Sequence, residues 1–180
     1  MNKIWLVSDW HFNHNKEFVW KARGYESVEA MNQDQIEKHN AIVADDDIVY
    51  VLGDCIMGDL DAGIAILKQL KGRKYLAYGN HCTDARIAAY KKENIFEEIN
   101  MGYRIKKGKY SFILSHYPQL VANGGEEQKI YTIHGHTHST HPFSEVFHAY
   151  NVNIDAHNGY PVSIDQIITD IKENRNNVET

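Results

Sequence analysis

The chain has few cysteines, no long apolar run and no excess of basic residues, and each shortage excludes a class of protein. Only two residues of 180 are cysteine, so we expect no disulfide framework and a reduced, cytoplasmic setting. No apolar run approaches the roughly 20 residues that a membrane-spanning helix needs, and the N-terminus lacks the pattern of a secretory signal. The net charge of −5 argues against a non-specific binder of duplex nucleic acid, which is usually basic.

The composition is that of an ordinary globular protein. Hydrophobic residues make up 43% and charged residues 24%, and the length suffices for one domain with a sizeable core. Neither an internal repeat nor a low-complexity segment divides the chain. We therefore expect a single domain over 1–180, with a polar tail from about residue 172 that frays.

Five short apolar runs are rich in β-branched or aromatic residues and are predicted to be buried strands. They are IWLV (4–7), IVYVL (48–52), YLAY (75–78), FIL (112–114) and IYTI (130–133). Helices are expected between some of these runs and near the C-terminus. They cover 28–43 after an N-cap at Ser27, 59–72 up to Gly72, 84–94, and the segment that follows the capping box of Ser163 and Gln166.

Strand and helix alternate in the first half of the chain, which indicates parallel pairing. The second half differs, with a predicted hairpin that turns near Gly108 and a further extended stretch at 145–155. Together the two halves predict an α/β fold in which two sheets face each other with helices outside.

Residues that can bind metal follow each of the five runs. They are Asp9 and His11, then Asp54, then Asn80 and His81, then His116, and finally His136 and His138. Taken singly, each has an ordinary explanation as a turn, a cap or a packed histidine. Because ligands of open α/β sheets bind beyond the carboxyl ends of the strands, we expect these side chains to converge. The joint pattern predicts a metal centre.

The segments SDWH, VLGDC, YGNH, LSHY and IHGHTH, in this order, resemble the motifs of the calcineurin-like metallophosphoesterase superfamily. They span Asp9 to His138, which is most of the chain. The segment NVNIDAHNGYPVSIDQI (151–167) is similar to the C-terminal segment of the compact bacterial and phage single-domain branch. The resemblance implies a four-layer αββα sandwich of two mixed β-sheets flanked by helices, with a centre of two divalent metal ions.

The resemblance also implies a role for each motif residue. Asp9, His11 and His138 would hold one metal, Asn80, His116 and His136 the other, Asp54 would bridge both, and the catalytic His81 would lie over the substrate phosphate without binding metal. Such ligands suit manganese, with iron, zinc or nickel as alternatives, better than calcium or magnesium alone. Two ions of this kind can clamp a phosphate and generate hydroxide near neutral pH. The expected function is therefore a metal-dependent phosphoester hydrolase, specifically a phosphodiesterase that uses a bridging hydroxide on a small phosphodiester or nucleotide.

Two positions depart from the superfamily motifs. Cys82 stands where an acid usually follows Gly-Asn-His, and Asp84 lies two residues later. Met57 stands where many relatives carry an aspartate that orients the catalytic histidine. Either Asp84 substitutes as the partner of His81, or the chemistry relies on the metals and on the acidity of the leaving group.

Loop residues near the strand ends are candidates for substrate binding. His14 and Arg23 could contact a phosphate, the arginine through its planar fork, although a surface histidine and a solvated arginine are the alternatives. Loops 12–27 and 119–129 are expected to form the walls of the substrate site. His134 shares the parity of the neighbouring ligands and is expected to pack against or support them.

Besides the phosphodiesterase, the sequence is compatible with a non-catalytic scaffold and with a nuclease or phosphomonoesterase. A non-catalytic scaffold is possible because some relatives keep the fold as a protein-interaction platform. A nuclease or a phosphomonoesterase would use the same centre. Because the chain is short and acidic, a nucleic-acid substrate ranks below a small phosphoester. The sequence does not define the oligomeric state.

Overall fold

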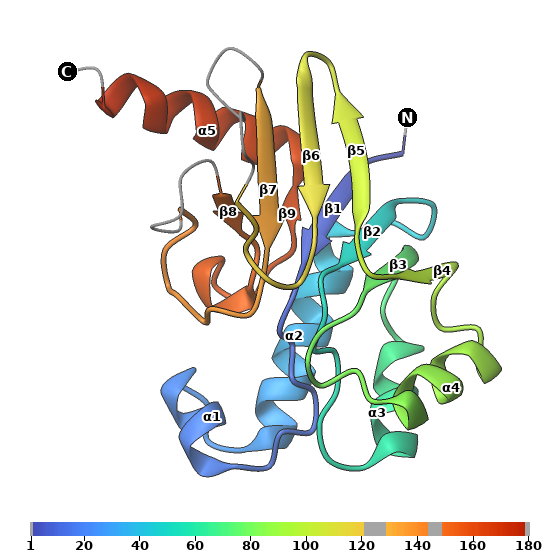
Figure 1. The fold of residues 1–180 in the computed structure, drawn as a ribbon. Helices are drawn as coiled ribbons and strands as arrows, with labels where there is room; N and C mark the ends of the chain where they lie inside the picture. Colours follow the sequence, from blue (N-terminus) through green and yellow to red (C-terminus); the bar gives the residue numbers. More distant parts are fainter. Residues whose placement is uncertain (1, 121–128, 144–148, 179–180) are drawn as a thin grey trace.

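Two mixed β-sheets form the centre of the fold, and helices flank them (Figure 1). A computed structural model describes residues 2–120, 129–143 and 149–178. The first sheet has the order β4-β3-β2-β1-β9, with β1 (Ile4–Val7), β2 (Ile48–Val51), β3 (Arg73–Ala77), β4 (Glu98–Asn100) and β9 (Val162–Ser163). The second has the order β5-β6-β7-β8, with β5 (Tyr103–Lys107), β6 (Tyr110–Leu114), β7 (Ile130–His134) and β8 (Ala149–Asn151). The predicted fold class, two mixed sheets flanked by helices, is confirmed.

The pairing directions agree with the alternation seen in the sequence. β1 to β4 pair in parallel, and β9 adds an antiparallel edge next to β1. In the second sheet the hairpin of β5 and β6 turns at Gly108, whose φ is +57°, and β6, β7 and β8 pair in parallel. Within each sheet, the strands that precede predicted ligands therefore run parallel to one another, and their carboxyl ends lie at the same edge.

The first hydrophobic core lies between the first sheet and the helices α2 (Val28–Ile42), α3 (Leu60–Leu67) and α4 (Asp84–Lys92). Trp5 and Val7 of β1 point into this core, because alternate residues of a strand share a face. Leu6, between them, points the other way into a second core. β1 is therefore buried on both faces, which explains why its sequence is continuously apolar.

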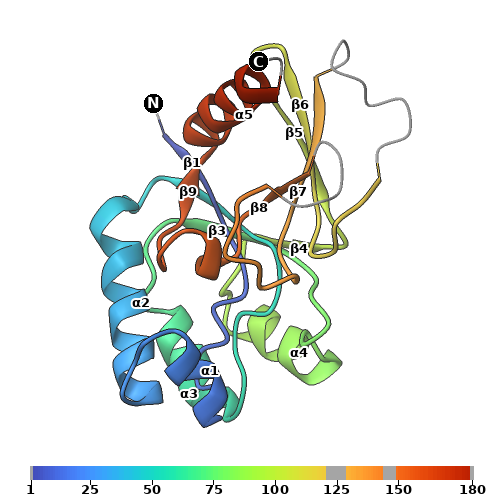
Figure 2. The same cartoon turned by 90° about the vertical axis from the view of Figure 1, so that its left-hand side faces the viewer.

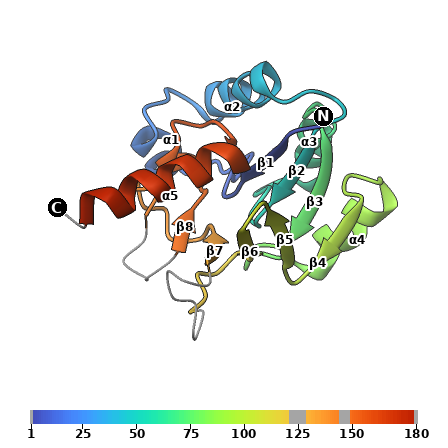
Figure 3. The same cartoon turned by 90° about the horizontal axis from the view of Figure 1, so that it is seen from above.

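The second core lies between the two sheets and is closed by α5 (Ile164–Val178). Leu6 and Phe112 meet there from opposite sheets, together with Ile164, Ile167 and Ile171 of the helix. The spacing of three and four residues places these isoleucines on one face of α5. Figures 2 and 3 show the helix lying across one end of the sheets.

Several local predictions are confirmed in detail. Each of the five apolar runs forms a strand. Ser27 Oγ accepts a hydrogen bond from the Ala30 amide at 3.1 Å and so caps α2. Ser163 Oγ likewise accepts from the Gln166 amide at 3.1 Å at the start of α5. The Gln166 side chain donates instead to Asp170, so the capping box is only half formed.

Other boundaries differ from those predicted. α3 ends at Leu67, five residues before Gly72, whose φ of +89° belongs to the turn that leads into β3. α5 extends to Val178, and residues 179–180 lie outside the described part. Of the extended stretch expected at 145–155, only β8 is a strand, and 145–148 are not described.

Four short elements were not predicted: α1 (Glu17–Ala22), β4, β9 and the 3-10 turn η1 (Ile154–Ala156). Each has six residues or fewer, which is too short for a periodic pattern to be recognised. None of the helices in the described ranges is long and apolar enough to cross a bilayer.

Asp47 connects the start of β1 to the turn before β2 through hydrogen bonds. Their contribution to the stability of the fold can be tested. Its buried carboxylate accepts from the Lys3 amide (2.8 Å), the Trp5 indole (2.8 Å) and the Ala44 amide (3.1 Å). Asp47→Asn replaces one accepting oxygen by a donor and leaves at least one of these N–H groups unpaired. We expect the free energy of unfolding in urea to fall by about 1–3 kcal/mol.

Asp46→Asn is the matched control for Asp47→Asn, because Asp46 lies exposed in the same turn. Equal urea midpoints for the two variants would show that the Asp47 hydrogen bonds contribute nothing to stability.

Candidate metal centre

The loops that follow β1, β2, β3, β6 and β7 bring the predicted ligands together. Backbone contacts hold these loops against one another: the His11 amide donates to the Asp54 carbonyl at 3.1 Å, and the Gly135 amide to the His116 carbonyl at 3.0 Å. The His136 amide donates to Asp9 Oδ2 at 2.8 Å and so joins the two sheets.

The first group of side chains consists of Asp9, His11 and His138. The two imidazole Nε2 atoms lie 3.2 Å apart, and each lies 3.7 Å from Asp9 Oδ1. Ligands about 2.0–2.1 Å from a metal ion stand about 3.0–3.4 Å from one another, so this spacing is close to that of neighbours in one coordination sphere. Asp9 Oδ1 is buried and has no hydrogen-bond partner in the described part of the chain. An orphaned carboxylate oxygen that faces two imidazoles fits a cation.

The second group consists of Asn80, His116 and His136. Asn80 Oδ1 lies 2.7 Å from His116 Nε2 and 3.1 Å from His136 Nδ1, and the two ring nitrogens are 3.2 Å apart. The His116 Nδ1–H donates to the Leu52 carbonyl at 2.8 Å. The Nε2 atom therefore carries the free electron pair. An amide oxygen and two imidazole nitrogens therefore converge on one position.

Asp54 lies between the two groups. Its Oδ2 is 3.9 Å from His11 Nε2 and 3.5 Å from His116 Nε2. Its Oδ1 accepts from the His81 amide at 2.9 Å. One oxygen of Asp54 is thus held by backbone, and the other faces both groups, as a bridging ligand requires.

Burial disfavours the charged forms of His11, His136 and Asp9, whereas the hydrogen bond to Asp155 raises the pKa of His138. Desolvation lowers the pKa of His11 to about 2 and also lowers the pKa of His136. Desolvation raises the pKa of Asp9, against the opposing effect of its hydrogen bond from Ser8 Oγ at 2.6 Å. Two buried carboxylates need compensating positive charge, which divalent cations would supply.

Five of the predicted ligands have left-handed backbone conformations. The φ angles are 60° at Asp9, 50° at His11, 49° at Asp54, 66° at His136 and 49° at His138. Such conformations cost non-glycine residues about 1–3 kcal/mol each and persist where the surroundings impose them, often at functional sites. The left-handed residues coincide with the predicted ligands, which supports the interpretation of this cluster as a functional site.

Glycine is required beside two of these ligands because the chain passes too close to them. A Cβ on Gly135 would come nearer than 3.0 Å to Ser8 Oγ and Asp9 Oδ2. A Cβ on Gly79 would come equally near to Asp54 Oδ1. The glycine of one motif therefore packs against the carboxylate of another.

His81 lies at the edge of the centre with its ring partly exposed. Its Nε2 is 3.9 Å from Asp54 Oδ2, and its ring centroid is 5.4 Å from that of His11. No hydrogen bond or ion pair joins Asp84 to His81, both of which are described, so the contacts do not favour Asp84 over the alternative that the metals and the leaving group suffice. Asp84 lies in the first turn of α4, and the His81 loop is held instead by Arg86, which donates to the His81 carbonyl at 2.8 Å.

The two loop candidates have different surroundings. The His14 ring is 5.8 Å from the His11 ring, so His14 borders the centre as predicted. Arg23 does not extend towards the ligands with a free fork. It donates to Asp155 at 2.8 Å and to the carbonyls of Asp9 and Trp10, both at 2.9 Å. These contacts engage the guanidinium within the chain, and its predicted contact with a substrate phosphate stays a prediction.

Three residues with a clear place in the centre were not singled out from the sequence. Ser8 donates to Asp9, and Asp155 accepts from His138 Nδ1–H at 2.8 Å. The Tyr117 ring lies 4.7 Å from that of His136. Ser8 and Tyr117 are adjacent to motif residues, and Asp155 lies in the segment similar to the compact branch, but adjacency alone assigns no role.

His134 and the two cysteines are further residues beside the motif positions. His134 is buried, and its Nδ1–H donates to the Gly135 carbonyl at 2.8 Å. Burial raises the pKa of Cys55 and of Cys82, which disfavours a reactive thiolate. Of the two predicted loop walls, 12–27 is described and contains α1, whereas 121–128 lies outside the described residues.

Known proteins resemble this chain over nearly its whole length. The family described as calcineurin-like phosphoesterase matches residues 2–179. Uncharacterized protein MJ1445 of Methanocaldococcus jannaschii is 33% identical over 182 residues, which cover 97% of this chain and 94% of that protein. Gene 66 protein of Mycobacterium phage L5 is 30% identical over 196 residues, covering 93% of each chain. The crystal structure of the protein of unknown function AQ665 from Aquifex aeolicus has the same fold, with a TM-score of 0.73, 23% identity, and coverage of 94% of this chain and 99% of that one.

Gly135→Ala tests the close packing of the motifs without removing a ligand. The new Cβ would displace the Asp9 carboxylate, so we expect the affinity for Mn²⁺ to fall at least about tenfold, measured by isothermal titration calorimetry. Gly63→Ala is the control, because its Cβ would collide only with the Ile56 side chain of the first core and with no predicted ligand. Unchanged Mn²⁺ affinity in Gly135→Ala would contradict the packing argument.

Proposed function

Because the chain belongs to the calcineurin-like phosphoesterase family, we propose that it is a metal-dependent phosphodiesterase acting on a nucleotide or a similar small phosphodiester. The observation that carries the proposal is the convergence of two ligand groups on either side of Asp54, with the buried Asp9 Oδ1 left without a partner. A protein that served only as an interaction platform would not need the unpartnered Asp9 Oδ1 or left-handed backbone at five predicted ligands.

The assignment of ligands follows the two groups. Asp9, His11 and His138 would hold one divalent ion, Asn80, His116 and His136 the second, and Asp54 would bind both. Manganese is proposed first, and iron, zinc or nickel would suit the same nitrogen and oxygen donors. When bound, such ions supply Lewis acidity to a phosphate and lower the pKa of water.

The protein side chains perform the remaining steps. Asp54 and Asp9 would balance the positive charge of the ions, and the imidazoles of the two groups would turn one nitrogen electron pair each towards them. His81 lies at the partly exposed edge, where its ring N–H can donate to a phosphate oxygen and then protonate the leaving oxygen. His14, beside His11, would line the same edge.

Exposed aromatic side chains on the rim favour a substrate that carries a base or another flat ring. Tyr117 is 49% exposed and packs edge-on against His116 and His136. Phe18 is 73% exposed, and its ring contacts His14. Exposed rings next to a phosphate site are suited to stacking on nucleobases. A nucleic-acid substrate stays the second candidate for the same reason, although the net charge of −5 disfavours a long polyanion.

Metal dependence and the role of His81 can be tested together. Protein stripped with chelator and reloaded with Mn²⁺ is expected to hydrolyse bis(p-nitrophenyl) phosphate faster than p-nitrophenyl phosphate. Asp54→Asn and His81→Ala should each lower kcat at least about a hundredfold, through loss of the shared ligand and of the general acid.

Asp84→Asn is the control for these variants, because Asp84 lies in the first turn of α4 without contact to His81, and it should keep kcat within about twofold. Absence of hydrolysis of both esters by protein that binds two metals would favour the scaffold function.

Tyr117 provides a test of the substrate class. Tyr117→Ala should raise KM for thymidine 5′-(p-nitrophenyl phosphate) at least about fivefold, because stacking contributes about 1–3 kcal/mol per base. KM for methyl p-nitrophenyl phosphate, which has the same leaving group without the nucleoside, should change little. Tyr117→Phe keeps the ring and should behave as the wild type. An equal change for both substrates would exclude Tyr117 as a contact for the nucleoside.

A further inference from the structure

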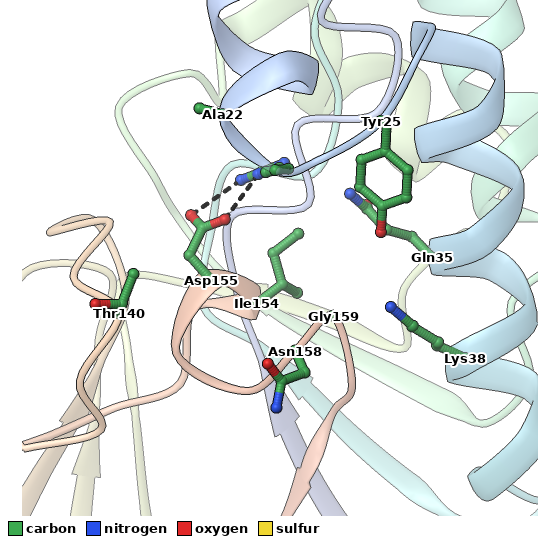
Figure 4. Close-up of a pocket in the computed structure, with 10 residues that line it drawn as sticks. Ala22, Tyr25, Gln35, Lys38, Thr140, Ile154, Asp155, Asn158 and Gly159 are labelled. Carbon is green, nitrogen blue, oxygen red and sulfur yellow. Dashed lines mark hydrogen bonds and ion pairs between the residues drawn. The ribbon is translucent and has the colours of Figure 1, made fainter.

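Asp155 and Arg23 form a pair that is largely withdrawn from solvent next to the first ligand group. Their side chains are 16% and 10% exposed. Arg23 Nε donates to Asp155 Oδ1 at 2.8 Å and Nη2 to Oδ2 at 3.2 Å, the two contacts drawn as dashed lines at Asp155 in Figure 4. The two-point geometry fixes the plane of the carboxylate as well as its position.

Arg23 also holds the loop that carries the ligands of β1. Its Nη1 donates to the Trp10 carbonyl and its Nη2 to the Asp9 carbonyl, each at 2.9 Å. One guanidinium therefore connects the turn η1, which contains Asp155, to the loop of Asp9 and His11. Asp155 lies 132 residues after Arg23 and Asp9 lies 14 residues before it, yet all three segments border the same centre.

Asp155 in turn contacts His138, the exposed member of the first group. A carboxylate can only accept, so the 2.8 Å contact places the His138 proton on Nδ1. The electron pair of Nε2 then faces His11 Nε2 and Asp9 Oδ1, as a metal ligand must. His138 is 44% exposed, so packing alone does not fix its ring. His116 in the second group has its proton placed by the Leu52 carbonyl and makes no use of Asp155.

We propose that Asp155, held in place by Arg23, is the positioning residue of the first metal site, where it sets the tautomer and the ring orientation of His138. This inference rests on the proposed metal-dependent function. It makes a site-specific claim: loss of Asp155 weakens the site of Asp9, His11 and His138 and leaves the site of Asn80, His116 and His136 intact. An ion pair that served only to stabilise the fold would not distinguish the two sites.

The pair borders a cavity of about 290 Å³, lined also by Tyr25, Gln35 and Lys38 (Figure 4). Because both residues border this cavity and neither new side chain is larger, Arg23→Lys and Asp155→Asn introduce no steric clash. It also provides a matched control, because Lys38 forms its ion pair with Asp34 at 2.7 Å on the same wall and contacts no ligand.

The test is metal binding by chelator-stripped protein, measured by isothermal titration calorimetry with Mn²⁺ and by the visible absorption of bound Co²⁺. The wild type is expected to bind two ions. Asp155→Asn should bind one ion with unchanged affinity and the second about 10–100-fold more weakly, with a changed Co²⁺ spectrum. Arg23→Lys keeps the charge but loses the fork, and it should weaken the same site to a smaller extent. Lys38→Gln should match the wild type in both sites.

The outcomes separate this inference from the proposed function. A wild type that binds no metal overturns both. A wild type that binds two ions, together with Asp155→Asn that binds two with unchanged affinities, overturns the role of Asp155 alone. Equal weakening of both sites, with a lowered thermal midpoint, would assign the pair to fold stability and also overturn the proposal. If Asp155→Asn does not fold, Arg23→Lys decides by the same criterion.

Discussion

Two buried carboxylates, Asp9 and Asp54, are the constraint on which the rest of the centre depends. Each uses one oxygen to accept a backbone N–H from a different loop, from His136 in one case and from His81 in the other. Each keeps its second oxygen for the surrounding imidazoles. Because a buried carboxylate is costly without a partner, the loops that supply these contacts must lie close together, and the two sheets are joined where they do.

The conformational cost of this arrangement is concentrated at the strand ends. Left-handed backbone at Asp9, His11 and Asp54 and the close approach of Gly79 and Gly135 all occur within the same few loops. The strands before these loops have no left-handed residues, and their side chains alternate regularly between the two cores. Strain of this kind persists only on a scaffold that is stable elsewhere, and the two cores on either face of β1 provide that stability.

The residues of the centre fall into a buried set and a more exposed set, and the two sets have different roles. Asp9, Asp54 and His116 are buried and have their orientations set by hydrogen bonds, which suits the chemistry common to a family. His14 and Tyr117 lie further out, on loops that can vary without moving the ligands. Specificity for a substrate would reside in this outer part, which the ligand motifs do not define.

The sequence by itself determined the five strands, the two main helix caps and the set of candidate metal ligands, because these depend on local periodicity and on which residues follow each strand. The tertiary structure alone decided that Arg23 pairs with Asp155, that the carboxylate nearest to His81 is Asp54 and not Asp84, and that α3 ends before Gly72. The reason is distance along the chain: Arg23 and Asp155 are separated by 132 positions, and no local pattern records a contact that forms only when both loops are in place.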